Sequence, residues 1–252
     1  MKIAVIGGTG LIGSALVRHL EAIPATDVVV IARSTGVDVL DADQLAQALE
    51  GVSAVIDVIN TGAVTRDDLV SFFSASTAAL LHAEAAVGVQ HHVLLSIIGV
   101  DQAPEEAHFA GKLAQENLVR SASVPYTIVR ATQFFEYAEM AVGWGLDGET
   151  SHIPPLLMQP ISLADTARML ADAAAGAPAN GIIEIAGPER HDLVDVARRT
   201  LAASGQHLVL DPSWDESGTG TEMAGNLLLP HEGALIGTDT LQQWLDERSS
   251  TR

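Results

Sequence analysis

The first thirteen residues of this chain restrict its fold more than any other segment. Ile3 to Ile6 form an apolar run that predicts a buried strand, and Gly7, Gly10 and Gly13 follow before an apolar helix. Glycines let a phosphate approach the backbone, because no Cβ stands in the way, and the free N–H groups of the next helix can face it. Gly13 also lets that helix pack closely on the strand. This order of elements predicts a dinucleotide site, with a glycine turn that binds nothing as the alternative.

The end of the second apolar run indicates which dinucleotide binds. Residues 27–32 predict a buried strand that ends at Arg33. An acidic residue at this place holds the 2′-hydroxyl of NAD, whereas an arginine accommodates the 2′-phosphate of NADP. Residues 32–36 contain no Asp or Glu, and Ser34 and Thr35 add two hydroxyl groups. We therefore predict NADP, with an exposed arginine at a strand end as the alternative.

Strands and helices alternate along the rest of the chain. Further strands are predicted at residues 37–40, 53–59, 91–97, 124–130, 181–186 and 208–210. Helices are predicted at residues 43–49, 67–87, 107–120, 163–174, 193–201 and from about 240. This alternation is typical of a parallel sheet with right-handed crossovers. We predict an α/β, Rossmann-type doubly wound sheet in a single domain over 1–252, in which about 133–160 and 187–252 contribute a small C-terminal substrate lobe.

Composition excludes several classes of function. The chain has 32 acidic and 13 basic residues, a net charge of −19 and no cysteine. Nucleic-acid binding needs a basic patch, and thiolate metal sites and disulfides need cysteine, so we expect neither nucleic acid nor a thiolate site. His91 and His92 are adjacent rather than spaced to share one face, and no Asp and His cluster occurs in the sequence, so we expect no metal. No uninterrupted apolar run approaches the ~20 residues of a membrane span. We expect a cytoplasmic monomer or homodimer with a small-molecule substrate and no membrane partner.

Three polar residues in the middle of the chain are candidates for chemistry. Ser96 lies near the carboxyl end of the strand predicted at 91–97, where open α/β sheets bind ligands. His108 and Lys112 are four residues apart and share one face of a predicted helix. A hydroxyl, an acid–base group and a cation would suit proton transfer coupled to hydride transfer. The alternative is a solvated helix surface.

Together these segments resemble the atypical short-chain dehydrogenase/reductases, in particular the NmrA-like NAD(P)-binding branch. The resemblance covers nearly the whole chain and rests on residues 7–13, 33, 111–116, 124–135 and 161–165. It implies an NADP(H)-binding oxidoreductase that prefers NADPH over NADH and reduces a small apolar carbonyl, quinone or enone by hydride transfer. Two alternatives stay open: a redox sensor that binds NADP(H) without turnover and contacts a protein partner, and a nucleotide-sugar epimerase-like isomerase.

One position departs from the family's catalytic pattern. Members with the usual pattern carry a tyrosine four residues before the lysine, and this chain has His108 there. The missing tyrosine favours the sensor, whereas the Ser96 and Lys112 pair favours the reductase. With an ordinary pKa near ~6.5, His108 is predicted to donate the proton. By the resemblance, Lys112 lies near the nicotinamide ribose.

The predicted site residues fall into three groups. The catalytic candidates are Ser96, His108 and Lys112. The candidates for cofactor binding are Gly7, Thr9, Gly10, Leu11, Ile12, Gly13, Arg33, Ser34, Asp38, Asn60 and Lys112. The candidates for substrate contact are Phe134, Phe135 and Tyr137, for which ordinary core packing is the alternative.

Overall fold

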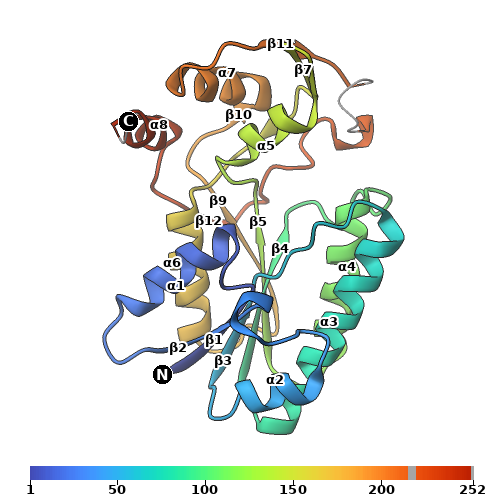
Figure 1. Cartoon of the computed structure of the whole chain (residues 1–252), viewed down its shortest axis with the longest axis vertical. Coiled ribbons are helices and arrows are strands. Elements are labelled where there is room, and N and C mark those ends of the chain that lie inside the picture. Colours follow the sequence, from blue (N-terminus) through green and yellow to red (C-terminus); the bar gives the residue numbers. More distant parts are fainter. Residues whose placement is uncertain (215–219, 251–252) are drawn as a thin grey trace. The chain divides into compact units, whose positions relative to one another are not determined.

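A seven-stranded parallel sheet forms the centre of the fold in the computed structural model, which describes residues 1–214 and 220–250 (Figure 1). Its order is β12-β9-β5-β4-β3-β1-β2. The strands are β1 (Lys2–Ile6), β2 (Asp27–Ile31), β3 (Ala54–Asp57), β4 (His91–Ile97), β5 (Tyr126–Ala131), β9 (Gly181–Ala186) and β12 (Leu235–Ile236). The predicted Rossmann-type α/β fold is confirmed.

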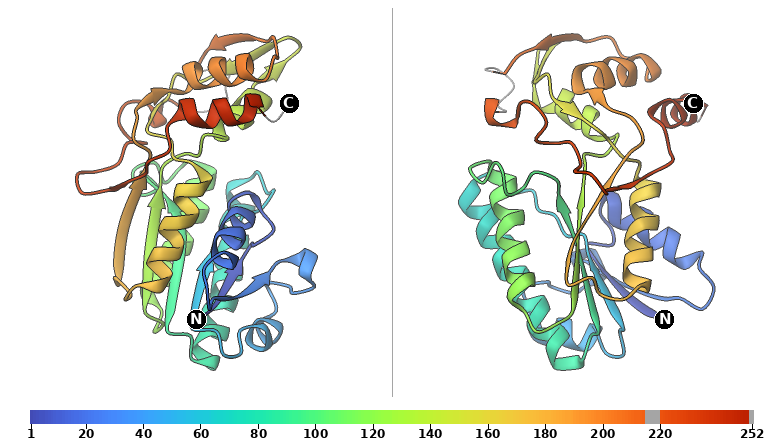
Figure 2. Two further views of the ribbon diagram at one scale, coloured as in Figure 1. Left: turned by 90° about the vertical axis from the view of Figure 1, so that its left-hand side faces the viewer. Right: turned by 180° about the vertical axis from the view of Figure 1, so that it is seen from behind.

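Helices cover both faces of this sheet (Figures 1 and 2). α1 (Leu11–Glu21) and α6 (Leu163–Ala175) lie on one face. α2 (Ala42–Ala48), α3 (Arg66–Val87) and α4 (Ala107–Ser121) lie on the other. Apolar side chains from α2 and α3 form one buried cluster with β1, β2 and β3, and side chains from α3 and α4 form another with β4 and β5. Burial of these apolar faces is the main favourable term in folding.

Helix α3 has clear signals at both ends. It begins after Thr65, whose hydroxyl accepts a hydrogen bond from the backbone N–H of Asp68 at 3.2 Å. It ends at Gly88, which has φ 79° in the left-handed region that glycine adopts without strain. These signals explain why the helix predicted at 67–87 forms within one residue of the expected bounds.

The strand predicted at residues 37–40 is absent, so that prediction was wrong. A side-chain oxygen of Asp38 accepts from the backbone N–H of Leu40 at 3.0 Å. Asp41 caps α2 by accepting from the backbone N–H of Gln44 at 3.0 Å. Such local side-chain contacts compete with a strand ladder. Without this strand, the order at the sheet edge is β2-β1-β3, and the topological switch point lies between β1 and β3.

The chain divides into two compact units. The first comprises Met1–Arg130 and Thr166–Ile183, and the second comprises Ala131–Asp165 and the residues from Glu184 onward. The second unit includes strand β12, the end of β9 and the start of α6. Its own helices are α5 (Tyr137–Trp144), α7 (Leu193–Ala203) and α8 (Leu241–Ser250). Its own strands form a sheet of β6 (Leu146–Asp147), β7 (Thr150–Ile153) and β11 (Val209–Pro212), and a pair of β8 (Leu157–Met158) and β10 (His191–Asp192). Its role as a substrate lobe stays a prediction.

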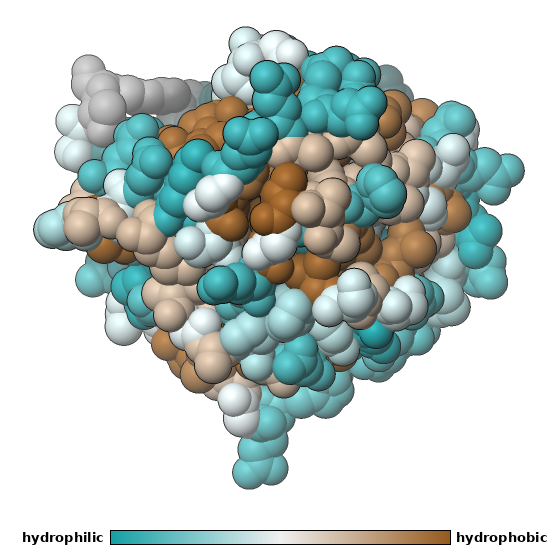
Figure 3. All heavy atoms as spheres, turned by 90° about the horizontal axis from the view of Figure 1, so that it is seen from below, coloured by the Kyte–Doolittle hydropathy of each residue, from teal (hydrophilic) through white to brown (hydrophobic). Residues whose placement is uncertain are grey.

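Among the described residues, α3 is the one helix whose length and composition would allow it to cross a membrane. It has 22 residues, and its most apolar window has a mean hydropathy of 1.3. However, it buries Phe73, Leu80 and Glu84 inside the first unit, and a core helix of this kind passes the same test. Exposed apolar residues also occur elsewhere, and the face in Figure 3 mixes hydrophobic patches with hydrophilic residues. The composition of α3 is therefore weak evidence for a membrane span.

Candidate functional site

The turn between β1 and α1 needs glycine at two positions for reasons of packing. A Cβ on Gly13 would lie 2.1 Å from the carbonyl oxygen of Gly7, inside the backbone itself. Gly7 has φ +80°, and a Cβ there would lie 3.0 Å from the Cα of Ile59, just after β3. The turn is therefore pressed against the segment that follows β3, at the switch point where this fold class binds ligands.

Gly10 is different, because packing does not explain it. Its φ of −76° and ψ of −176° are open to any residue. Within the described residues, a Cβ at this position would have one neighbour within 4 Å, the Gly7 carbonyl oxygen at 3.3 Å. Gly10 precedes α1, whose first turn has neither a side-chain cap nor an acidic residue. The first N–H groups of α1 can therefore bind an anion, and a bare backbone at Gly10 lets a pyrophosphate reach them.

The residues after β2 lie beside this turn. Arg33 is exposed at the start of a short 3₁₀ helix, Arg33–Thr35, and its side chain makes no hydrogen bond or ion pair within residues 1–214 and 220–250. The Ser34 hydroxyl donates to the Thr9 hydroxyl at 3.2 Å, which ties the 3₁₀ helix to the glycine turn. The Thr35 hydroxyl instead bonds the backbone N–H and carbonyl of Ala32. Arg33 and Ser34 thus remain the groups suited to a ribose phosphate.

The remaining cofactor candidates also belong to the first unit. Asp38 and Asn60 are exposed, and their side-chain oxygens accept from the backbone N–H groups of Leu40 and Thr61 at 3.0 and 2.9 Å. In the first turn of α1, Leu11 is exposed, whereas Ile12 is buried. Contact of these residues with a cofactor stays a prediction.

Lys112 is buried in the first unit, with 5% of its surface exposed. Its Nζ donates a hydrogen bond to Oε1 of Gln115 and lies 4.9 Å from the ring centroid of Phe73. The Gln115 amide nitrogen in turn donates to a carboxylate oxygen of Asp57 at 2.7 Å. Burial lowers the pKa of Lys112 to about 8, against the opposing charges of Asp57 and Glu116. A buried lysine of this kind exchanges a proton near neutral pH.

His108 shares the Phe73 ring with Lys112. It is half-buried, and its ring lies edge-on to Phe73 at a centroid distance of 5.8 Å. Burial first, and then the charge of Lys112, lowers the pKa of His108 to about 4. The prediction that His108 titrates near neutral pH is therefore wrong, because the ring is neutral at pH 7. The lowered pKa counts against His108 as the proton donor, and a catalytic role of His108 stays a prediction.

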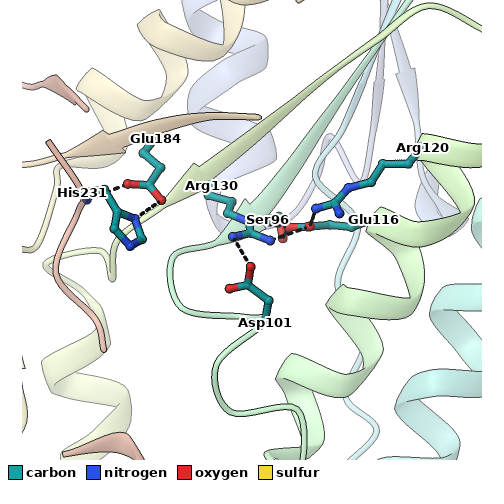
Figure 4. Close-up of polar contacts among 7 residues, drawn as sticks. All are labelled: Ser96, Asp101, Glu116, Arg120, Arg130, Glu184 and His231. Carbon is teal, nitrogen blue, oxygen red and sulfur yellow. Dashed lines mark hydrogen bonds and ion pairs between the residues drawn. The ribbon is translucent and has the colours of Figure 1, made fainter. Parts of the chain in front are cut away.

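Ser96 belongs to a network of ion pairs that is buried at Glu116 and Arg130 and exposed at Arg120 and Asp101 (Figure 4). Its hydroxyl donates to a carboxylate oxygen of Glu116 at 2.6 Å. Glu116 also accepts from Nε and Nη2 of Arg130, both at 2.9 Å, and from Arg120 at 2.6 Å. Arg130 reaches Asp101 through Nη1 at 3.1 Å. The hydroxyl of Ser96 therefore contacts Glu116 rather than Lys112 or His108 within the part of the chain that the structure describes. His108 and Lys112 both contact the ring of Phe73.

Sequence reasoning missed Asp57, Gln115 and Arg130. Asp57 is the one charged residue in the apolar run 53–59, and Arg130 is the one in the run 124–130. Charged side chains are rarely fully buried unless they are paired, so each of these two was a signal for a buried partner. No pattern marks Gln115, because the helix position of a lone glutamine does not indicate what it contacts.

The aromatic candidates for substrate contact lie in the second unit. Phe135 is 1% exposed and packs on Trp244 at a centroid distance of 5.6 Å, so it is a core residue. Phe134 is half-buried and forms an isolated bridge with Ile161. Tyr137 is half-buried and lies edge-on to Trp144, which is exposed. Contact of Phe134 and Tyr137 with a substrate stays a prediction.

The second unit also contains a histidine and carboxylate pair, drawn in Figure 4. Glu184 on β9 accepts from the backbone N–H of His231 at 2.7 Å and contacts its Nδ1 at 2.8 Å. His231 is exposed, so this pair secures the loop before β12 and contributes little to stability.

Comparisons with known proteins support an NAD(P)H-binding fold. A family model described as NAD(P)H-binding matches residues 7–176. The chain is similar to the dTDP-4-dehydrorhamnose reductase of Bacillus anthracis in complex with NADP, at 17% identity over 100% of this chain and 99% of that chain, with a TM-score of 0.77. It is also similar to an NADPH-dependent quinone oxidoreductase of Escherichia coli complexed with NADPH, at 18% identity over 97% and 99% of the chains, with a TM-score of 0.71.

An epimerase has the same fold. The UDP-N-acetylglucosamine 4-epimerase of Bacillus cereus is 18% identical over 100% of this chain and 96% of that chain, with a TM-score of 0.72. At such identities the likeness to solved structures shows the fold alone. No curated protein matches the chain.

Proposed function

Because this chain belongs to the NAD(P)H-binding family, we propose that it is an atypical short-chain dehydrogenase/reductase that acts as an NADPH-dependent reductase of a small, largely uncharged carbonyl, quinone or enone. The observation that carries the proposal is Lys112, a buried cation with a pKa of about 8 in the unit that holds the glycine turn. When bound, NADPH supplies the hydride. The remaining requirements are to bind the cofactor and to deliver a proton.

Binding is assigned to the glycine turn and to the end of β2. The first N–H groups of α1 would bind the pyrophosphate, and the bare backbone at Gly10 would leave room for it. Arg33 and Ser34 would hold the 2′-phosphate, since residues 32–36 contain no acidic residue to favour the 2′-hydroxyl of NAD. This arrangement supports the preference for NADPH over NADH.

Proton delivery is assigned to Lys112. At pH 7 its ammonium group is mostly charged, because its pKa is about 8, and a group titrating close to the working pH is an efficient acid. His108 is neutral at this pH, because its pKa is about 4. Lys112 therefore donates the proton to the oxygen that gains charge on reduction, and His108 lies beside it as a neutral neighbour. A catalytic role of Ser96 stays a prediction.

A redox sensor that binds NADPH without turnover is the second candidate. The burial of Lys112 against Gln115 and Phe73 favours it, since it limits access to Nζ. No tyrosine stands at the position of His108 to reach a substrate instead.

An assay of NADPH oxidation separates the two functions. We expect the protein to oxidise NADPH in the presence of at least one member of a panel of quinones, ketones and enones, and to oxidise NADH more slowly. The Arg33→Ala variant should lose most of this preference, because the cation for the 2′-phosphate is removed. Tight NADPH binding without oxidation by any member of the panel would overturn the reductase and favour the sensor.

Gly10→Ala should separate cofactor binding from folding. We expect NADPH affinity to fall about 10- to 100-fold, which corresponds to about 1.4–2.7 kcal/mol, because a Cβ intrudes on the pyrophosphate. The unfolding free energy of the cofactor-free protein should fall by only about 1 kcal/mol, the amount by which alanine is a poorer N-cap than glycine. Titration of NADPH fluorescence and urea denaturation measure the two quantities.

Gly143→Ala is the matched control for this substitution. Gly143 lies in α5, and nothing among the described residues lies within 4 Å of its Cβ position. We expect its NADPH affinity to equal that of the wild type. An unchanged affinity in Gly10→Ala would contradict the assignment of the turn.

A further inference from the structure

We propose that Asp57 and Gln115 are positioning residues that hold the ammonium group of Lys112 and connect it to the glycine turn. The inference rests on the proposed function in one respect, namely the use of Lys112 for proton delivery. The contacts themselves lie entirely within the first unit.

The first half of the connection runs from the glycine turn to Asp57. The Cβ position of Gly7 is 3.0 Å from the Cα of Ile59, so the turn rests directly on the segment after β3. The backbone N–H of Ile59 donates to Oδ1 of Asp57 at 3.0 Å. Asp57 is the last residue of β3 and is buried, with 1% of its surface exposed. One of its carboxylate oxygens therefore fixes the segment on which the glycine turn rests.

The second half runs from Asp57 to Lys112. Oδ2 of Asp57 accepts from the amide nitrogen of Gln115 at 2.7 Å. This contact fixes the orientation of the amide, because its nitrogen faces the carboxylate and its oxygen faces Lys112. Gln115 is completely buried, so no water competes for either end of the amide. The oxygen that accepts from Lys112 is thus held in place by a residue on another element.

The charges around Lys112 are distributed over several elements. Asp57 on β3 and Glu116 on α4 stabilise its charged form, and burial opposes them. Two histidines, His92 on β4 and His108 on α4, experience the positive charge of Lys112. Phe73 on α3 presents its ring to Nζ. Of these groups, Asp57 is the one joined to Lys112 by a continuous hydrogen-bonded path through Gln115.

The composition of the chain makes this proposal easy to test. The protein has two lysines, Lys2 and Lys112, so lysine labelled with ¹³C at the ε-carbon gives two side-chain signals in an NMR spectrum. Loss of one signal in Lys2→Arg assigns the other to Lys112. Titration of the Lys112 signal with pH then measures the pKa of the ammonium group in the folded protein without cofactor or substrate.

Three variants test the two positioning residues. In Gln115→Met we expect the midpoint of the Lys112 signal to fall by about one pH unit, the size of one lost hydrogen bond to a charged group. Gln115→Glu should raise the midpoint, because a negative acceptor replaces a neutral one. Asp57→Asn should lower it, because the carboxylate is lost while the amide of Gln115 keeps a partner.

Ser76→Ala serves as the control for a general loosening of the first unit. It removes a buried hydroxyl that donates to the Phe72 carbonyl at 2.8 Å on α3, and it should leave the midpoint unchanged. Equal midpoints in the wild type and in all three variants of Gln115 and Asp57 would overturn the proposal. Failure of NADPH oxidation would overturn the reductase alone, because the titration needs no turnover.

Discussion

Replacing Lys112 with methionine is expected to lower NADPH-dependent turnover about 100- to 10,000-fold, the range that one acid–base group supplies. The same change should not lower the unfolding free energy at pH 7. Burial shifts the pKa of Lys112 from 10.5 to about 8. At about 1.36 kcal/mol per pH unit, this shift corresponds to roughly 3 kcal/mol of penalty for the charged form. Methionine fills a similar volume and carries no charge, so this penalty disappears. Its removal offsets the hydrogen bond that is lost at Gln115.

The pH dependence of the unfolding free energy tests whether the charge on Lys112 destabilises the folded protein. Below about pH 8 Lys112 is protonated in the folded and the unfolded protein, so the wild type carries the full penalty. As the pH rises from about 8 to 10.5, the folded protein releases the proton before the unfolded chain does. Urea denaturation should therefore show the wild type gaining stability relative to Lys112→Met over this range.

Turnover provides the second check on Lys112. In the wild type, kcat/KM should fall above about pH 8, because Lys112 loses the proton that it donates. His108→Phe should keep this fall, since the His108 ring is already neutral there. Near-wild-type turnover in Lys112→Met would contradict the assignment of the proton donor.

Replacing Glu116 with glutamine is expected to lower the unfolding free energy by about 3–5 kcal/mol. Glu116 is completely buried, and it pairs with Arg130, whose side chain is 4% exposed. A neutral amide leaves the Arg130 guanidinium buried without its main counter-charge. It also replaces the carboxylate oxygen that accepts from the Ser96 hydroxyl. Urea denaturation with a two-state fit measures the loss.

Asp101→Asn is the matched control, because it removes a second carboxylate from the same arginine. The Asp101 side chain is 51% exposed, so its pair with Arg130 is worth about 1 kcal/mol or less. Equal losses of unfolding free energy in Glu116→Gln and Asp101→Asn would contradict the prediction, because the buried pair of Glu116 and Arg130 would then stabilise the fold no more than the exposed pair of Asp101 and Arg130.

Elements with a strong local pattern were predictable from the sequence. The strands β4 and β9 form over the predicted residues 91–97 and 181–186, because each is a continuous run rich in β-branched or apolar residues. The missing strand at 37–40 shows the limit of this pattern. Its apolar residues alternate with Asp38, whose carboxylate instead bonds the local backbone.

The site was predictable only where its parts are close in the sequence. The glycine turn lies within seven residues, 7–13, and a spacing rule describes it. The contact of Asp57 with Gln115 joins residues 58 positions apart, and no local pattern specifies it. The low pKa of His108 comes from burial against Phe73 and from the charge of Lys112. Both causes depend on tertiary packing, so an ordinary pKa was the default expectation.

The order in which the chain visits its two units has a consequence for synthesis on the ribosome. The first unit is interrupted after Arg130 and resumes at Thr166, so α6, which shares a face of the sheet with α1, is made only after residues 131–165. Domains generally fold as units as the chain emerges. A nascent chain that ends before Leu163 lacks α6 and therefore exposes the part of the sheet face that α6 covers later. Completion of the nucleotide-binding unit has to wait for roughly three quarters of the protein to be translated, and truncation after Arg130 would remove part of the unit itself.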